Sequence, residues 1–371
     1  MDAIIYWIGF SLVKGIGAVR LQALLDYFGS LEVAWQAPAD ALRAAGLSQK
    51  IVETMTQVRH SVDLPRYLES IQKKGIHILT WEDERYPRRL KEIDQPPPVL
   101  YVRGTLGQDD DVAVAIVGTR RASVYGRQVA EELAAYLARN GVTVVSGLAR
   151  GVDTYAHQAA VKNGGRTLAV LGCGVDIIYP PENRKLGEEV IAHGALVSDY
   201  APGTPPEASN FPPRNRIISG LSRASVVVEA GETSGALITA SFAANQGREV
   251  FAVPGNIYSP LCKGTNRLIQ QGATPLLKME DVLQMLGMEY AAEQVSARRV
   301  LPGDEFERKL LEALGNDPLH IDELMERTGL TIDKVSATLA LMELKGMVRQ
   351  VGGMNYVGVR ETPAPYSQEG N

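Results

Sequence analysis

The sequence predicts an α/β protein in which helices cover both faces of a parallel sheet, flanked by a small helical domain and a C-terminal winged helix. Apolar strand-like runs alternate with helix-period segments from residue 112 to residue 277. Residues 1–70 carry helical apolar periodicity, and residues 304–361 follow the order helix, helix-turn-helix and β-hairpin. A chain of 371 residues is long enough for two or three such domains.

The composition is that of an ordinary globular protein. Hydrophobic residues make up 45% of the chain and charged residues 22%, which argues against a disordered, collagen-like or mostly membrane-embedded chain. Two cysteines allow neither a disulfide framework nor a CxxC metal pair, so we expect a cytoplasmic protein without a metal site. The apolar run Ala3–Val13 is too short for a membrane span and lacks the basic flank of a signal peptide.

Residues 1–70 are expected to form a small helical domain of the helix-hairpin-helix or SAM-like type. The turn Gly15-Ile16-Gly17 precedes a helix that ends at Gly29 and has four apolar residues on one face: Leu21, Leu24, Leu25 and Phe28. Such a turn can offer backbone N–H groups to a phosphate, but a tight turn alone explains both glycines. We therefore predict a structural role for it.

Residues 71–290 are expected to hold the parallel sheet. Short strand-like pieces at 76–79 and 99–102 lead into it. The strands of the sheet itself are predicted at Val112–Val117, Val142–Val145, Thr167–Leu171, Ala195–Ser198, Ser225–Val228, Glu249–Val253 and Thr274–Leu277. Ligands of such sheets bind beyond the carboxyl ends of the strands, where helix N-termini converge. The strand-to-helix turns should therefore contain the functional site.

The first two turns predict an anionic ligand. The first contains Gly118, Thr119, Arg120 and Arg121, directly after a buried strand. The second contains Ser146, Gly147 and Arg150, and we expect the open backbone N–H groups of its small residues to bind a phosphate, although structural glycines are an alternative. The dinucleotide fingerprint G-x-G-x-x-G is absent, and the second strand does not end in a ribose-binding carboxylate. We therefore expect no nicotinamide or other cofactor.

Later turns add cations and aromatic side chains. Arg184 and Lys185 follow the third strand. Residues 210–220 are expected to form a proline-fixed loop that carries Phe211, Arg214, Asn215 and Arg216. Tyr179 and Phe211 are suited to stacking unpaired bases at about 1 to 3 kcal/mol each, and packing is an equally good explanation for them.

Positive charge is concentrated in the middle domain. Between Val112 and Thr274 there are fifteen Lys and Arg against twelve Asp and Glu, a net charge of +3, whereas the whole chain has a net charge of -5. Seven cations belong to segments expected on one rim: Arg120, Arg121, Arg150, Arg184, Lys185, Arg214 and Arg216. Several separated cations along one edge fit a polymeric phosphate chain better than a single mononucleotide. This pattern predicts nucleic-acid binding.

Taken together, these turns resemble the DNA processing protein A (DprA, also called Smf) family. The resemblance rests on GTR at 118–120, SGLARGVD at 146–153, FPPRNRIISG at 211–220, SGALITA at 234–240 and VPG at 253–255. It implies an extended Rossmann-like fold that forms a homodimer, binds and protects incoming single-stranded DNA and loads RecA onto it in natural transformation and recombination. By this resemblance the DNA contacts are Arg120, the Ser146-Gly147 turn and the cation at Arg184 or Lys185.

The rival hypothesis is a lysine-decarboxylase-like nucleotide phosphoribohydrolase, which the same sheet architecture resembles. Those enzymes carry the signature PGGxGTxxE, whereas residues 229–237 read EAGETSGAL, without a carboxylate at the last position. Hydrolysis of an N-glycosidic bond needs carboxylates, and the nearby candidates are Asp153, Glu229 and Glu232. We predict that the chain is not an enzyme.

Two further residues invite a chemical role that we do not favour. His157 lies four residues after Asp153 on one helix face, which suggests a catalytic or metal pair. Without further ligands, a helix-capping aspartate and a packed histidine explain the two residues better. Cys173 has no visible base nearby and is expected in the core.

The C-terminal region is expected to comprise a linker at 291–303, the winged helix at 304–361 and a disordered tail at 362–371. Between Asp304 and Arg360 there are seven basic and ten acidic residues, a net charge of -3. The third helix, which winged helices often place in a DNA groove, carries almost no cations. A protein-contact or regulatory role is therefore the better hypothesis for this domain.

Overall fold

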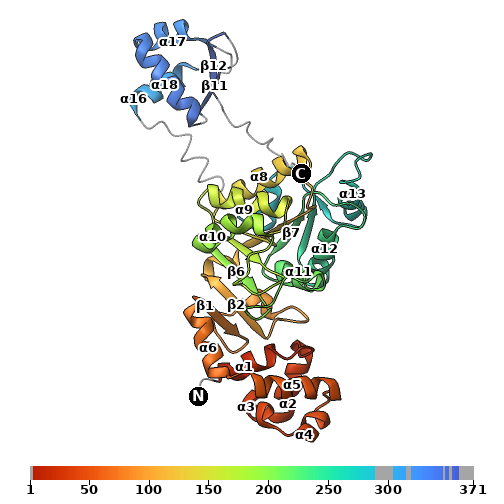
Figure 1. The fold of residues 1–371 in the computed structure, drawn as a ribbon. Helices are drawn as coiled ribbons and strands as arrows, with labels where there is room; N and C mark the ends of the chain where they lie inside the picture. The colour runs from red at the N-terminus through yellow and green to blue at the C-terminus, as the bar shows by residue number, and fades with distance from the viewer. Residues whose placement is uncertain (1–2, 289–303, 315–318, 346, 351–352, 359–371) are drawn as a thin grey trace, which may run out of the picture. The chain divides into compact units, whose positions relative to one another are not determined.

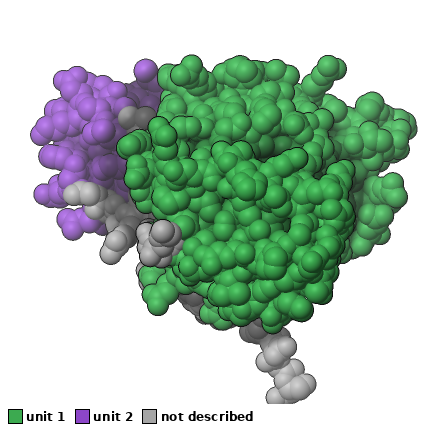
Figure 2. All heavy atoms as spheres, turned by 60° about the horizontal axis from the view of Figure 1, so that its bottom comes forward, with its two compact units in different colours: residues 1–287 green, residues 288–371 purple. Residues whose placement is uncertain are grey.

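The computed structural model describes residues 3–288, 304–314, 319–345, 347–350 and 353–358. The chain forms two compact units, Met1–Gly287 and Met288–Asn371, shown in two colours in Figure 2. The predicted linker at 291–303 and the predicted tail at 362–371 lie outside the described residues. In the part of the chain that is described, no helix is both long and apolar enough to cross a bilayer.

A nine-stranded sheet in the order β1-β2-β6-β5-β4-β3-β7-β8-β9 forms the centre of the first unit (Figure 1). From β6 to β9 neighbouring strands are parallel, and β2 is antiparallel to both β1 and β6. The predicted Rossmann-like α/β fold is confirmed, and β1 and β2 extend its sheet. The strands are β1 (Ile76–Thr80), β2 (Val99–Gly104), β3 (Ala113–Val117), β4 (Thr143–Ser146), β5 (Thr167–Val170), β6 (Gly194–Ser198), β7 (Ala224–Val227), β8 (Glu249–Ala252) and β9 (Thr274–Pro275).

Helices cover this sheet on both faces, so its central strands β3 to β7 are buried throughout. All five residues of β3 are buried, as expected for a strand between two helical layers. The helices that follow β3, β4 and β5 pack side by side on one face, and those that precede and follow β7 pack together on the other. The helices of this part are α7 (Arg88–Lys91), α8 (Val124–Arg139), α9 (Val152–Lys162), α10 (Arg184–His193), α11 (Phe211–Gly220), α12 (Gly235–Asn245), α13 (Lys263–Gln270) and α14 (Glu280–Met285).

The order of the strands creates a switch point at β3. From β3 the chain builds β4, β5 and β6 to one side, and then crosses to β7, which pairs with the other side of β3. The turns that leave β3 and β7 therefore diverge, and a crevice opens between them at the carboxyl edge of the sheet. Such a crevice is the usual ligand site of an open α/β sheet.

The N-terminal helices pack against the antiparallel end of the sheet. They are α1 (Ile4–Ser11), α2 (Ala18–Phe28), α3 (Leu31–Gln36), α4 (Ala39–Ala44), α5 (Gln49–Ser61) and α6 (Leu64–Lys73). Helix α6 extends past residue 70, where we place the domain boundary, and contacts β1. The hydroxyl groups of Ser11 and Tyr101 lie 2.7 Å apart and join α1 to β2. Gly15 has a φ of 100°, as the predicted tight turn requires.

The second unit is a winged helix in the order that the sequence predicts. Its elements are α16 (Glu305–Ala313), β10 (Leu319–His320), α17 (Ile321–Thr328), α18 (Ile332–Leu344), β11 (Val348–Gln350) and β12 (Asn355–Gly358). Gly329 ends α17 at a φ of 69°, and β11 and β12 form the predicted hairpin. The short strand β10 pairs with β12 and was not predicted. Lys334 lies over the Phe306 ring, with Nζ 5.0 Å from the ring centroid.

His157 is buried and neutral in the folded protein. Its Nδ1 lies 2.7 Å from the Thr167 hydroxyl, whose own hydrogen is donated to the Val144 carbonyl, so the imidazole N–H is the donor. Its Nε2 has no hydrogen-bond partner among the described residues. Burial lowers the pKa of His157 to about 3, so the packed histidine that the sequence favours is confirmed.

This histidine predicts a loss of stability in mild acid. An unfolded histidine takes up a proton near its ordinary pKa of 6.5, whereas folded His157 stays neutral down to about 3, so stability is lost as the pH falls through this interval. From about pH 7.5 to about pH 5.5, His157 alone should lower the free energy of unfolding by about 1 kcal/mol. Over this pH range, the free energy of unfolding of His157→Leu, measured with urea, should fall by about 1 kcal/mol less than that of wild type. Equal losses would contradict the assignment.

Candidate nucleic-acid interface

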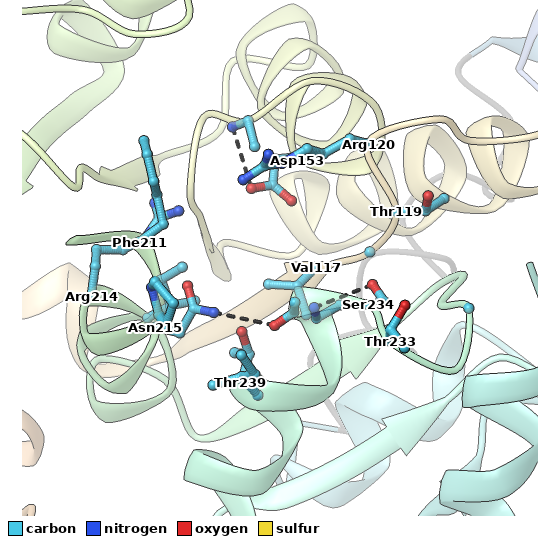
Figure 3. Close-up of a pocket in the computed structure, with 18 of the residues that line it drawn as sticks. Val117, Thr119, Arg120, Asp153, Phe211, Arg214, Asn215, Thr233, Ser234 and Thr239 are labelled. Atoms are coloured by element: carbon cyan, nitrogen blue, oxygen red, sulfur yellow. Dashed lines mark hydrogen bonds between the residues drawn. The ribbon is translucent and has the colours of Figure 1, made fainter. Parts of the chain in front are cut away.

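A cavity of about 870 Å³ opens at the switch point between β3 and β7. Its walls come from the turns after these two strands and from the first turns of α11 and α12. Figure 3 shows Arg120 and Asp153 on one side of Val117, and Thr233, Ser234 and Thr239 on the other. The predicted position of the site, beyond the carboxyl ends of the strands, therefore coincides with this cavity.

The turn after β3 is held in place by close backbone contacts. The Thr119 N–H donates to the Glu229 carbonyl at 2.7 Å, and the Thr119 carbonyl accepts from the Val152 N–H at 3.2 Å. A Cβ at Gly118 would lie 2.6 Å from Val152 Cγ2, and one at Gly151 would lie 2.3 Å from the Thr119 carbonyl oxygen. Both positions therefore need glycine, and the turn that they permit presents Arg120 at the surface.

Arg120 lies in a cluster of cationic and aromatic side chains. Arg120, Arg150, Tyr179 and Phe211 line one small hollow beside the cavity. The Arg120 guanidinium carbon is 5.8 Å from the Phe211 ring centroid, and the Tyr179 and Phe211 rings are 5.8 Å apart. Tyr179 is 40% exposed. The structure therefore brings together two of the predicted cations and both predicted stacking residues.

Arg121, Arg184 and Lys185 are also exposed, in the turn after β3 and at the start of α10. Arg150 pairs with Glu182, and Lys185 Nζ lies 3.7 Å from Glu189. Exposed ion pairs of this kind are worth about 0 to 1 kcal/mol, so a phosphate can replace the carboxylate at little cost. Arg120 forms no ion pair among the residues that the structure describes.

The turn at Ser146-Gly147 does not offer the open N–H groups that the sequence suggests. The Gly147 and Ala149 N–H groups donate to the Asp153 carboxylate at 3.1 and 3.3 Å. Ser146 is fully buried, and its hydroxyl donates to the Ile116 carbonyl at 2.6 Å. The predicted phosphate cradle is therefore filled by the protein's own carboxylate. The prediction that Asp153 caps its helix is wrong, because Asp153 lies inside α9 and binds the preceding turn, and Gly151 is the N-cap.

Residues 211–220 form helix α11, not the predicted loop. Its two prolines occupy the first helical turn, where a missing N–H costs nothing, so they start the helix instead of preventing it. Asn215 lies on the cavity side of this helix, and its Nδ2 donates to the Gly235 carbonyl at 3.2 Å. The helix separates side chains that a loop would allow to converge.

Arg214 and Arg216 consequently point in different directions. Two residues along a helix correspond to a rotation of about 200°, which places the side chains on opposite faces. Arg214 is 4% exposed, lines the cavity, and donates from Nη1 to the Gly147 carbonyl at 2.9 Å and to the Val170 carbonyl. Arg216 turns away from the cavity and pairs with Asp199 at 2.9 Å. Neither arginine is a free cation on the rim, contrary to the expected convergence of all seven.

The carboxylates that a hydrolase would need are engaged elsewhere. Glu229 is 1% exposed and accepts from the Ser123 N–H at 2.9 Å and the Ser123 hydroxyl at 2.6 Å. Glu232 is exposed, with Lys263 Nζ at 3.8 Å. Cys173 is a core residue as predicted, and burial raises its pKa to about 11. Across the described ranges, no group of three or more His, Cys, Asp and Glu side chains is arranged to hold a metal.

The far wall of the cavity contains residues that the predicted site omits. Thr233, Ser234 and Gly235 line it at the start of α12, with Thr239 one turn further. Hydroxyl groups and a glycine that open a helix after a buried strand are a visible sequence signal. The predicted site omits them because the order of the strands is not visible in the sequence. Only the pairing of β7 with β3 brings these residues opposite Arg120.

Comparisons with known proteins agree with this fold. The family model described as DNA recombination-mediator protein A matches residues 77–287, and the DprA winged helix domain matches residues 294–354. Protein Smf of Synechocystis sp. is 38% identical, with 95% of this chain and 98% of that protein covered. Protein Smf of Escherichia coli is 35% identical, with 92% and 95% covered.

Two solved structures are also similar. The DNA processing protein A of Streptococcus pneumoniae has a TM-score of 0.65 and 35% identity, covering 76% of this chain and 97% of that one. The Helicobacter pylori protein, whose structure is described by its single-stranded DNA binding mode, has a TM-score of 0.51 and 31% identity, covering 57% and 95%. The chain therefore belongs to the DNA recombination-mediator protein A (DprA/Smf) family.

Proposed function

We propose that this chain binds single-stranded DNA along the carboxyl edge of its sheet and, as a cytoplasmic homodimer, protects that strand and loads RecA onto it in natural transformation and recombination. The observation that carries the DNA-binding part is the hollow lined by Arg120, Arg150, Tyr179 and Phe211. Cations for phosphates and rings for bases then lie within reach of the same strand. The RecA, dimer and cytoplasm parts rest on the family resemblance.

Three further cations extend this hollow into a longer basic path. Arg121 lies next to Arg120, and Arg184 and Lys185 begin α10 after the neighbouring strand. We define the five exposed cations, Arg120, Arg121, Arg150, Arg184 and Lys185, as the rim. Because they come from the turns after three adjacent strands, β3, β4 and β5, they suit a chain of successive phosphates better than a single one.

Salt dependence tests this proposal directly. If all five rim cations contact phosphates, the log-log slope of oligo-dT affinity against salt should be about -3.5 between about 50 and 200 mM. A duplex of the same length should bind more weakly, because its paired bases cannot stack on Tyr179 and Phe211. Fluorescence anisotropy of labelled oligonucleotides measures both quantities. A shallow slope, or equal affinity for the duplex, would contradict the proposal.

The winged helix supplies the control for this experiment. Lys334 lies on its third helix over the Phe306 ring, and we propose a protein-contact or regulatory role for this domain. Lys334→Glu should therefore leave the affinity for oligo-dT and its salt slope unchanged. A large loss of affinity would show that the winged helix contributes to DNA binding.

We also propose that the site performs no chemistry. The support is that Asp153 and Glu229 are buried and accept hydrogen bonds from neighbouring residues of the fold. A carboxylate held in this way is poorly placed to activate water at a sugar carbon. Incubation with nucleoside 5′-monophosphates should release no free base, and release of base would favour the phosphoribohydrolase alternative.

A further inference from the structure

One buried arginine joins helix α11 to the sheet. Arg214 lies near the start of α11, and its Nη1 donates to the Gly147 carbonyl at 2.9 Å and to the Val170 carbonyl. Val170 ends β5, and Gly147 directly follows the last residue of β4. A single guanidinium group thus links the start of α11 to the carboxyl ends of two neighbouring strands.

The backbone at Gly147 is enclosed by two charged side chains. Its N–H donates to the Asp153 carboxylate at 3.1 Å, and its carbonyl accepts from Arg214. A Cβ at Gly147 would lie 2.4 Å from Arg214 Nη1 and 2.7 Å from Nη2, so the guanidinium packs directly on this glycine. Burial lowers the pKa of Arg214, and the nearby Asp153 carboxylate opposes this shift. At 4% exposure, Arg214 contacts the fold and offers little surface to a phosphate.

The same region of α11 carries Phe211. Phe211 and Arg214 are three residues apart, hence on one face of the helix, and the Arg214 guanidinium carbon is 5.8 Å from the Phe211 ring centroid (Figure 3). A Cβ at Gly172 would lie 2.9 Å from Phe211 Cδ1, so the ring packs on the bare backbone that follows β5. Tyr179, whose ring is 5.8 Å away, also follows β5. The spacing of the two rings therefore depends on how α11 is held against β5.

We propose that Arg214 is a positioning residue that makes the site selective for single strands. By joining α11 to the ends of β4 and β5, it holds Phe211 beside Tyr179, where unpaired bases can stack. The rim cations contact phosphates, which single strands and duplexes both carry, so they supply affinity without this selectivity. The inference rests on the proposed single-strand binding and names the residue that determines its selectivity.

Arg214→Lys tests this role because it keeps the charge. The lysine ammonium ends one bond short of Nη1 and lacks the planar group that packs on Gly147. A phosphate contact would survive the change, whereas the link from α11 to the strands would not. The affinity for oligo-dT should fall at least about fivefold, the affinity for a duplex of the same length should stay within about twofold, and the salt slope should not change. Fluorescence anisotropy measures all three.

Gly147→Ala tests the same role without altering a charged or aromatic residue. Its Cβ takes the place of the guanidinium, and the atoms in its way are the end of a side chain, which can move, so the variant should fold. It should show the same loss for oligo-dT alone. In a Phe211→Leu background, Gly147→Ala should cause no further loss, because Arg214 acts through Phe211.

Arg216→Lys is the matched control on the same helix. Arg216 is also mostly buried, but its Nη2 lies 2.9 Å from Asp199 and its Nε donates to the Gln95 carbonyl at 3.1 Å, away from the hollow. This variant should keep the wild-type preference for oligo-dT over the duplex. Urea unfolding of each variant in the binding buffer shows that the folded protein is being compared.

The outcomes separate this inference from the proposed function. A wild-type preference for oligo-dT that Arg214→Lys and Gly147→Ala both keep would overturn the role of Arg214 alone. Equal losses for oligo-dT and the duplex, or a full further loss from Gly147→Ala in the Phe211→Leu background, would also overturn it. A wild type that does not prefer oligo-dT to the duplex would refute the proposed function, and this inference with it.

Discussion

Replacing Arg120 by alanine is expected to weaken the binding of single-stranded oligo-dT by about tenfold, a loss of about 1.4 kcal/mol. Arg120 is exposed and forms no ion pair among the described residues, so its charge is available to a phosphate. Its guanidinium also lies 5.8 Å from the Phe211 ring centroid and borders the same small hollow as Tyr179. The loss of one phosphate contact should flatten the log-log salt slope by about 0.7. Anisotropy titrations at several salt concentrations measure both effects.

The control for this prediction is Arg139→Ala. Arg139 lies at the C-terminal end of α8, hence at the opposite edge of the sheet, where its Nη1 donates to Asn163 Oδ1 at 3.2 Å. The same change in net charge there should leave the slope unaltered. If both variants lose the same affinity, the effect is one of net charge, and Arg120 is not a contact.

Replacing Gly151 by alanine is expected to destabilise the first unit by about 3 kcal/mol. Gly151 has a φ of 76° and a ψ of -128°, a conformation that other residues rarely adopt. Its added Cβ would lie 2.3 Å from the Thr119 carbonyl oxygen, and backbone cannot move aside as the end of a side chain can. Urea unfolding measures the loss. DNA binding should fall as well, because the clash displaces the turn that carries Arg120.

Gly164→Ala is the matched control for this substitution. Gly164 has a similar φ of 68°, but a Cβ there meets nothing within 4 Å. Alanine there should therefore add only the strain of the backbone conformation, which lowers the free energy of unfolding by about 1 kcal/mol. The variant should keep its DNA affinity. If the two variants are equally unstable, the close contact between Gly151 and Thr119 is not what holds the turn that carries Arg120.

Much of the fold was predictable because its signals are local. The five-residue run Ala113–Val117 indicates a strand buried on both faces, and all of its residues are buried. The glycine turn at Gly329, followed by a further helix and a hairpin, indicates the winged helix that the structure contains. Arg120 and Arg150 stand directly after predicted strands, so their presence at the carboxyl edge follows from parallel pairing alone.

Three features of the site were mispredicted or missed, each for a different physical reason. Pro212 and Pro213 were taken as loop formers, whereas proline is favourable in the first turn of a helix. The N–H groups after Ser146 were taken as open, whereas Asp153 folds back onto them from the next helix. The role of Ser234 and Gly235 depends on β7 pairing with β3, although more than one hundred residues separate them in the chain.

The sequence by itself determined the class of sheet, the terminal winged helix and which turns carry charge, because periodicity and turn chemistry act over a few residues. Only the tertiary structure decided which charges are free. Arg120 stays at the surface, Arg214 becomes a buried wall of the cavity and Arg216 pairs with Asp199. The physical reason is that the state of a charge depends on the groups packed against it, and those groups come from strands and helices distant in the chain.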